Sequence, residues 1–316
     1  MRPEVIEGDV REVLKALDDE SVQCVVTSPP YWGLRDYGVD DQLGLEATPE
    51  EYVENMVDIF REVKRVLRKD GTVWLNLGDS YSSQPAGNKT PSGFSQTRPS
   101  RKKHGVGDET VDLPKKVTGL KPKDLVGVPW RVAFALQADG WYLRSDIIWN
   151  KPNPMPESVT DRPTKSHEYI FLLTKSKKYY YDNEAIKEAN ADPKRTNFTS
   201  GSRITKNKDR NDNDIAERDK NMIANGRNKR SVWKITTKPY KEAHFATFPE
   251  ELPELCIKAG TKRGDVVLDI FAGSGTTLRV ASKLGRKGIG IELNPEYIKI
   301  LKKRCKIESV SLEAFV

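Results

Sequence analysis

The sequence predicts an α/β fold in which helices cover a largely parallel sheet. Two observations support this class: apolar runs of strand length alternate with amphipathic helical segments, and the alternation continues along most of the 316 residues. No run of about 18 apolar residues occurs, which argues against a membrane-spanning segment. The formal net charge of +7 is compatible with a polyanionic partner but does not identify one.

The N-terminal half supplies the first of these elements. Residues 3–28 are expected to form a strand, a helix and a second strand, the last being the apolar run 22–26. Thr48 is a candidate N-cap with Pro49 in the first helical turn, and apolar residues then recur at helical spacing until residues 69–71 close the helix. The elements expected next are a strand at 72–78, a helix at 124–139, and buried strands at 141–150 and 168–175.

Two polar segments interrupt the alternation. Residues 80–123 are rich in Ser, Gly, Pro and Lys, and residues 183–230 are more polar still. Neither segment can contribute much to a core, so both are expected to be solvated loops or insertions. Because both are basic, they are also candidates for contacts with phosphate groups.

The cysteines exclude two kinds of site. Cys24, Cys256 and Cys305 lie far apart, are odd in number and form no Cys-x-x-Cys pair. This spacing fits neither a disulfide framework nor a zinc site, so we expect reduced thiols in a cytoplasmic protein without a bound metal.

The C-terminal segment 264–294 has the most regular pattern of the chain. A strand carrying Asp269 near its end runs into a tight turn, in which Gly273 and Gly275 are free to take positive φ. A helix beginning at Thr276 would offer its free N–H groups to an anionic group, and the next strand ends in Glu292, which suits two ribose hydroxyls. The pattern therefore predicts a site for a nucleoside-type cofactor.

The glycine spacing bears on which cofactor is bound. Dinucleotide sites use Gly-x-Gly-x-x-Gly, and here Gly273-Ser274-Gly275 is followed by Thr276-Thr277-Leu278. The third glycine is missing, which disfavours a nicotinamide oxidoreductase. A cofactor without a pyrophosphate fits better, such as S-adenosylmethionine with its carboxylate at the helix N-terminus.

A second motif, Ser28-Pro29-Pro30-Tyr31, follows the strand at 22–26. Proline fixes its own φ and keeps the preceding residue extended, so the carbonyl of Pro29 has a well-defined direction. The Ser28 hydroxyl and this carbonyl are acceptors for an exocyclic amine, and Tyr31 and Trp32 add flat surface on which a planar ring could stack.

Such a corner suits methyl transfer to an aromatic amine. The nitrogen lone pair is delocalised into the ring, and two acceptors aimed at its hydrogens favour the pyramidal geometry and the positive charge of the transition state. Methylation of cytosine at carbon 5 needs a thiolate, typically from a Pro-Cys dipeptide, and the sequence contains none. That reaction is excluded.

Together, Thr27-Ser28-Pro29-Pro30-Tyr31-Trp32 and the run from Asp269 to Thr277 resemble the motifs of the DNA amino-methyltransferases. The order, with the catalytic motif first and the cofactor motif last, is similar to the circularly permuted beta class of that family. Residues 5–14, 147–175 and 244–260 also resemble family blocks, so the resemblance covers nearly the whole chain except the two polar segments. Phe245 departs from the pattern, because many relatives carry proline there.

The resemblance implies a seven-stranded, Rossmann-like methyltransferase sheet with helices on both faces. It implies S-adenosylmethionine as cofactor, double-stranded DNA as partner and extrusion of the target base from the duplex. It divides the chain into a catalytic half (1–182, with the basic loop 80–123), a target-recognition region (183–230) and a cofactor half (231–316). A cognate restriction endonuclease becomes a candidate partner.

The residues expected at the site follow from the motifs and from the resemblance. The candidate catalytic residues are Ser28, Pro29, Pro30 and Tyr31. The candidate cofactor-binding residues are Asp9, His244, Phe248, Asp269, Phe271, Gly273, Ser274, Gly275, Thr276, Thr277 and Glu292. The candidate DNA-binding residues are Arg98, Arg101, Lys102, Lys103, Arg195, Arg203, Lys206, Arg210, Arg227 and Arg230.

The target base is the finer question. Relatives with Ser at the first motif position mostly methylate cytosine N4, and those with Asp or Asn mostly methylate adenine N6, so Ser28 favours cytosine. A hydroxyl accepts from either amine, so adenine N6 stays open. RNA as substrate, and a non-catalytic DNA-binding protein on the same scaffold, are the remaining alternatives.

Overall fold

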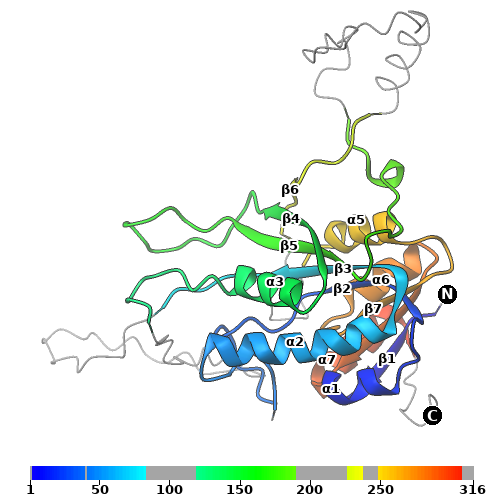
Figure 1. The fold of residues 1–316 in the computed structure, drawn as a ribbon, viewed down its shortest axis with the longest axis horizontal. Helices are drawn as coiled ribbons and strands as arrows, with labels where there is room; N and C mark the ends of the chain where they lie inside the picture. Colours follow the sequence, from blue (N-terminus) through cyan, green and yellow to red (C-terminus); the bar gives the residue numbers. More distant parts are fainter. Residues whose placement is uncertain (1, 40, 83–118, 190–225, 238–247, 308–316) are drawn as a thin grey trace, which may run out of the picture.

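One eight-stranded sheet forms the centre of the chain (Figure 1). The computed structural model describes residues 2–39, 41–82, 119–189, 226–237 and 248–307. The strands are β1 (Glu4–Glu7), β2 (Val22–Thr27), β3 (Leu67–Leu77), β4 (Tyr142–Asn150), β5 (His167–Thr174), β6 (Val232–Lys234), β7 (Val266–Asp269) and β8 (Lys287–Glu292). Their order across the sheet is β1-β8-β7-β2-β3-β5-β4-β6.

The sheet is parallel except around β5. The pairs β1–β8, β8–β7, β7–β2, β2–β3 and β4–β6 are parallel, whereas β5 runs antiparallel to both β3 and β4. The C-terminal ends of seven strands therefore lie along the same edge as the N-terminal end of β5. Residues that follow those strands, and those that begin β5, can meet there.

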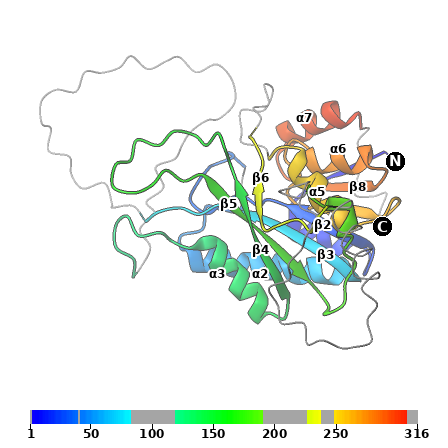
Figure 2. The same ribbon diagram turned by 90° about the horizontal axis from the view of Figure 1, so that it is seen from above.

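Helices cover both faces of the sheet (Figure 2). On one face α1 (Val10–Val13), α2 (Pro49–Val66) and α3 (Val128–Ala138) pack into the larger core cluster. On the other face lie α5 (Glu251–Gly260), α6 (Thr276–Lys283) and α7 (Pro295–Cys305). Two 3-10 turns, η1 (Leu14–Ala16) and η2 (Glu184–Ile186), join these elements.

Helix α2 shows how the sequence specifies one element. The Thr48 hydroxyl accepts from the backbone N–H of Glu51 at 3.1 Å, and Pro49 occupies the first turn. Its apolar residues recur on one face, so burying that face holds the helix against the sheet. The fully buried side chains of this face include Tyr52, Met56, Phe60 and Val63.

Three features differ from the sequence expectation. The sheet has eight strands instead of seven, because the short β6 pairs with the end of β4. Residues 69–71 do not close a helix: α2 ends at Val66 and β3 starts directly at Leu67. The first half of β4 is not buried, since β6 flanks only its last residues and Tyr142 stays 44% exposed.

The sheet also pairs a strand of the N-terminal part of the chain, β2, with a strand of the C-terminal part, β7. From β2 the chain continues to β3 on one side, and from β7 it continues to β8 on the other, so neighbouring strands β2 and β7 diverge. Ligands of open α/β sheets bind at such a switch point, outside the C-terminal ends of the strands. Among the helices described, none has both the length and the apolar composition of a transmembrane span.

Candidate active site

The proline corner and the glycine turn lie side by side at this switch point. Strand β2 ends at Thr27 and runs into Ser28, and the parallel strand β7 ends at Asp269 and runs into the glycine turn. The Thr27 hydroxyl donates to Asp269 Oδ1 at 2.8 Å. The two motifs that the sequence separates by more than two hundred residues therefore form one site.

The corner itself is held from several directions. The carbonyl of Pro30 accepts from the Tyr52 hydroxyl of α2 at 2.9 Å, and the carbonyl of Tyr31 accepts from Leu34 N at 3.2 Å. The expectation that Trp32 offers a stacking surface is wrong: its ring is only 3% exposed, and its Nε1 donates to the backbone of Glu46.

The Tyr31 hydroxyl is the centre of a polar network. Ser28 Oγ donates to it at 3.2 Å, and it donates in turn to Glu168 Oε2 at 2.8 Å. Asn76 lies beside both, with its Oδ1 3.2 Å from the Tyr31 hydroxyl and its Nδ2 3.1 Å from Glu168 Oε2. Burial, together with the nearby Glu168 carboxylate, holds the pKa of Tyr31 well above its ordinary value. Tyr31 is thus a neutral phenol that links Ser28 to a carboxylate.

Sequence reasoning missed the far end of this network. Glu168 stands at the start of β5, and Lys151, just after β4, forms an ion pair with its other oxygen. Both side chains are largely buried, so they interact with little screening by water. Glu168 reaches Tyr31 only because β5 runs antiparallel to its neighbours. A pattern of apolar residues along the sequence does not show strand direction.

The glycine turn has the backbone that the sequence predicted. Gly273 and Gly275 adopt φ of +51° and +77°. A Cβ on Gly275 would lie 2.7 Å from the Leu301 side chain, whereas one on Gly273 would meet nothing closer than 4.0 Å. Glycine is thus required at 275 for packing, and the turn at 273 borders open space where a ligand fits.

Glu292 closes the turn from the end of β8. Its Oε2 accepts from Gly273 N at 2.7 Å and its Oε1 accepts from Asn294 N at 2.9 Å. Burial raises the pKa of this carboxyl. Each carboxylate oxygen has a second lone pair, so these bonds leave acceptor capacity for ribose hydroxyls.

Asp269 is a buried carboxyl between the two motifs. It is 1% exposed and accepts from Thr277 Oγ1 at 2.7 Å and from Phe271 N at 3.2 Å, in addition to Thr27. Burial raises its pKa to about 7, although these hydrogen bonds oppose the shift. In this arrangement Asp269 fixes the cofactor turn to the catalytic strand.

Arg304 of α7 is a second site residue that the sequence did not predict, and it binds two hydroxyls of the glycine turn. Its guanidinium donates to Ser274 Oγ at 2.7 Å and to Thr276 Oγ1 at 2.9 Å, and its side chain is only 8% exposed. The hydroxyls of Ser274 and Thr276 are therefore engaged within the protein. In the sequence, Arg304 is one of three consecutive basic residues at a helix end, a pattern typical of a solvated face.

Three of the remaining cofactor candidates are described by the structure. Asp9 caps α1 through Arg11 N at 2.8 Å, and its carboxylate is ion-paired with the Arg11 side chain. Phe271 packs on the larger core cluster and Phe248 on the cluster of the opposite face. His244 lies outside the described residues.

A family model described as a DNA methylase matches residues 22–303, and therefore both motifs and the sheet between them. The chain belongs to the DNA methylase family. It is 49% identical over 308 residues to the Type II methyltransferase M.Cfr9I of Citrobacter freundii, covering 98% of this chain and 89% of that protein. It is 50% identical over 300 residues to M.SmaI of Serratia marcescens, covering 95% and 89%.

Solved structures match the fold. The cytosine-N4-specific PvuII DNA methyltransferase matches with a TM-score of 0.64 at 20% identity, covering 100% of this chain and 90% of that one. A putative DNA modification methylase of Thermus thermophilus, solved with S-adenosyl-L-methionine, matches with a TM-score of 0.58 at 23% identity, covering 96% and 93%. At these identities the likeness concerns the fold.

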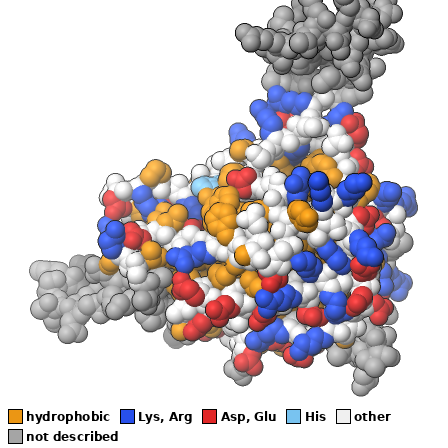
Figure 3. Space-filling model, in the orientation of Figure 1, with side chains coloured by type: hydrophobic (Ala, Val, Ile, Leu, Met, Phe, Trp, Pro, Cys, Tyr) orange, Lys and Arg blue, Asp and Glu red, His pale blue; other side chains and the backbone are white. Residues whose placement is uncertain are grey.

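Most of the DNA-binding candidates of this methylase lie outside the described residues. The two that are described, Arg227 and Arg230, both bind Glu188 Oε1, at 2.9 and 2.7 Å. Glu188 and Arg227 also form an antiparallel bridge, so these residues close the base of the segment between them. On the face shown in Figure 3, basic and acidic side chains are interspersed along the side where α2 lies.

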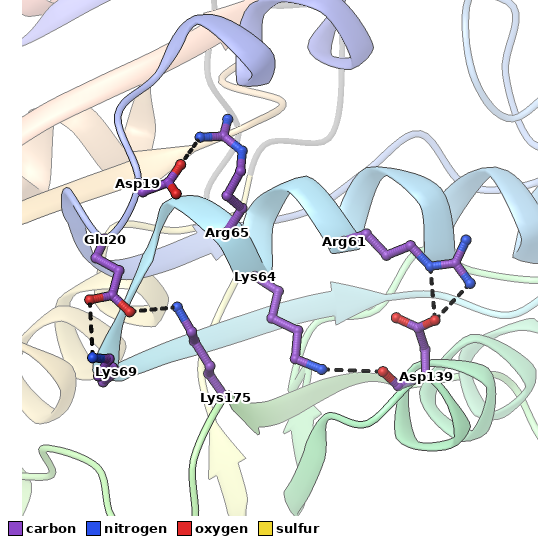
Figure 4. A pocket seen from close by; sticks show the side chains of 8 residues that line it. All are labelled: Asp19, Glu20, Arg61, Lys64, Arg65, Lys69, Asp139 and Lys175. Atoms are coloured by element: carbon purple, nitrogen blue, oxygen red, sulfur yellow. Dashed lines mark hydrogen bonds and ion pairs between the residues drawn. The ribbon is translucent and has the colours of Figure 1, made fainter.

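An open hollow elsewhere on the methylase is not a second site. Basic and acidic side chains from α2, the start of β3 and neighbouring loops line it (Figure 4). Arg61 pairs with Asp139, Arg65 with Asp19, and Lys175 with Glu20. Each of these charges already has a partner, so the hollow is a surface ion-pair network at the opposite edge of the sheet.

Proposed function

We propose that this DNA methylase transfers a methyl group from S-adenosylmethionine to the N4 amine of a cytosine in duplex DNA. The observation that carries the proposal is the contact between Thr27 and Asp269, which sets the acceptor corner Ser28-Pro29-Pro30-Tyr31 directly beside the glycine turn. A methyl donor on the turn and an amine at the corner would be neighbours, as direct transfer requires.

The turn suits the methyl donor. The space beside Gly273 is open, the acceptor Glu292 lies next to it, and the N-terminal end of α6 follows it. Glu292 is suited to the ribose hydroxyls, and the end of α6 to the carboxylate of the methionine moiety. When bound, S-adenosylmethionine supplies an electrophilic methyl group on a positively charged sulfur.

The corner suits the acceptor base. The carbonyl of Pro29 and the hydroxyl of Ser28 accept hydrogen bonds from the two hydrogens of the amine. These bonds draw the amine hydrogens out of the ring plane, free the lone pair for attack, and stabilise the positive charge that develops on nitrogen. The fixed φ of both prolines preorganises the acceptors.

The network behind the corner gives the released proton a route. After transfer, the amine carries one proton too many and passes it to Ser28 Oγ. Ser28 gives its own proton to Tyr31 at 3.2 Å, and Tyr31 gives its proton to Glu168 at 2.8 Å. Glu168 ends neutral beside the charged Lys151 and returns its proton to solvent. The raised pKa of Tyr31 makes it a carrier that is never ionised for long.

Serine at the first motif position supports cytosine N4, as in the resemblance to the amino-methyltransferases. The fold neighbour PvuII DNA methyltransferase, which is cytosine-N4-specific, adds support for the proposal. Adenine N6 is the second candidate, because a hydroxyl accepts from either amine.

The relatives named Type II methyltransferases support a proposal for the biological setting. We place the chain in a restriction–modification system of the cytoplasm, with a cognate endonuclease that cuts the same site. Segment 183–230 is the proposed target-recognition region, set between a catalytic part (1–182) and a cofactor part (231–316). Its basic residues would contact phosphates and base edges.

Nucleoside analysis tests the proposal. The purified chain is incubated with S-adenosylmethionine and unmodified genomic DNA, and the digested nucleosides are identified by mass spectrometry. N4-methylcytosine is the expected product. N6-methyladenine would overturn the assignment of the base and keep the reaction, whereas 5-methylcytosine or an unmethylated digest would overturn the proposed chemistry.

A further inference from the structure

A hairpin of residues 151–166 joins β4 to β5 and extends beyond the end of the sheet (Figures 1 and 2). Its base is part of the candidate active site, because Lys151 pairs with Glu168, the partner of Tyr31. On the other strand of the hairpin, Lys165 Nζ donates to the backbone carbonyl of Asp79 at 2.8 Å. The position of the hairpin is therefore fixed relative to the catalytic corner.

The hairpin is also braced along its length. Asn153 exchanges two hydrogen bonds with the backbone of Thr237, at 3.0 and 3.1 Å. Glu157 accepts from Arg162 at 2.8 Å, and the Arg162 guanidinium lies 4.1 Å from the centre of the Tyr81 ring. Prolines at positions 152, 154 and 156 restrict the backbone further. A segment held in this way presents its outermost side chains rigidly.

Met155 is the side chain that these contacts leave outside. It is 83% exposed, more than any other large apolar side chain in the described ranges; the next is Val232 at 60%. Its neighbours Asn153 and Glu157 are both engaged in bracing bonds, so Met155 is an exposed apolar side chain on a braced segment. Three residues lie between it and Lys151, so the Cα atom of Met155 lies within about 14 Å of the Cα atom of Lys151.

We propose that Met155 is a wedge that enters the base stack of duplex DNA at the position vacated by the target base. Proteins that unstack DNA insert apolar side chains, methionine among them, between base steps. Methionine is unbranched and polarisable, so it fits between flat bases. The short connection to Lys151, whose partner Glu168 binds Tyr31, keeps Met155 on the side of the site where the extruded base leaves its gap. This inference rests on the proposed function, and it adds how the extruded base is replaced.

The wedge predicts a defect that depends on base pairing. Extruding a paired base costs free energy, and the cost is least for a mismatched or unpaired base. Without the wedge, the vacated gap stays unfilled and the base returns more readily. Removing Met155 should therefore slow methylation of a fully paired site and have little effect where pairing is already lost.

The test compares Met155→Ala with the unmodified enzyme on two oligonucleotide duplexes. One carries the methylation site mapped on genomic DNA, and the other carries an abasic residue opposite the target base. We expect kcat/KM of Met155→Ala to fall about 10- to 100-fold on the paired duplex and to lie within about threefold on the abasic one. Met155→Leu should restore most of the rate, and Phe134→Ala, which truncates an exposed side chain of α3, is the matched control.

Each remaining outcome has a defined meaning. Equal rates of Met155→Ala and the unmodified enzyme on the paired duplex would overturn the wedge and leave the proposed function intact. An equal loss on both duplexes would mean that Met155 contributes to general DNA affinity, or contacts a different partner, and would also overturn it. An unmodified enzyme that methylates neither duplex would overturn the proposed function and the wedge with it.

Discussion

The hydroxyl of Thr27 and the carboxylate of Asp269 are 2.8 Å apart although 242 residues separate them in the chain. This bond joins the last residue of β2 to the last residue of β7, and the same carboxylate binds Thr277 in the first turn of α6. The proline corner and the glycine turn are therefore tied together through one carboxylate. A motif order in which the catalytic half comes first produces the same site as any other order, because the sheet places both strand ends side by side.

The buried carboxyl of Asp269 should make stability depend on pH. Its pKa is about 7 in the folded chain and near 4 when unfolded. Between these values the folded chain keeps a proton that the unfolded chain has lost. The contribution of this group to the free energy of unfolding is thus fully present below about pH 4 and falls as pH rises to about 7, by on the order of 4 kcal/mol.

Asp269→Asn removes this titration and isolates it from other groups. The free energy of unfolding of the unmodified chain minus that of the variant should fall steadily between pH 5 and pH 7 and then level off above about pH 7.5. Urea unfolding at four pH values measures the difference. A difference that is constant over this range would mean that Asp269 is ionised throughout in the folded chain.

Gly273→Val should abolish binding of S-adenosylmethionine. The substitution places a β-branched side chain at φ +51° and fills the open space that borders the turn. Gly264→Val is the matched control, because Gly264 also has positive φ (+95°), with nothing within 4 Å of an added Cβ, and lies before β7. Both variants carry about 1–2 kcal/mol of backbone strain, so calorimetric titration should show lost binding only for Gly273→Val. Equal affinities would place the cofactor elsewhere.

The turn and the corner could be predicted because their chemistry is local. The residue type alone restricts the backbone conformation at the two prolines and permits positive φ at Gly273 and Gly275. Both glycines have positive φ in the structure. Glu168 could not be found in this way, because its role depends on β5 running antiparallel to β3. The role of Arg304 could not be predicted for a similar reason, because only the packing of α7 directs its side chain to the glycine turn.

The pattern of apolar and aromatic residues also failed to predict two smaller features. Trp32 directly follows Tyr31 of the proline corner, and the sequence predicts that it offers a stacking surface. It packs in the core instead, because the loop through Glu46 folds back over it. The eighth strand, β6, has only three residues, fewer than a periodic pattern needs in order to stand out.

Tyr31→Phe should slow methyl transfer about 10- to 100-fold while S-adenosylmethionine affinity changes less than about twofold. The variant keeps the ring against Gly78 and removes only the hydroxyl that joins Ser28 to Glu168. Tyr52→Phe is the matched control, because it removes a hydroxyl bound to Pro30 in the same corner without touching the network. Single-turnover rates on DNA measure both variants, and equal losses would mean that either hydroxyl matters only for the stability of the corner.

Glu168→Gln should separate the proton route from simple positioning. The amide still accepts from Tyr31 but cannot take up its proton at neutral pH, so turnover should fall about 10- to 100-fold and recover partly in concentrated basic buffers that accept the proton directly. Lys151→Met removes the same ion pair and leaves the carboxylate on Tyr31, so it should retain most of the activity and show no such recovery. If Lys151→Met reproduced the loss of Glu168→Gln and no buffer rescued either variant, the ion pair would be what matters, and Glu168 would serve only to orient Tyr31.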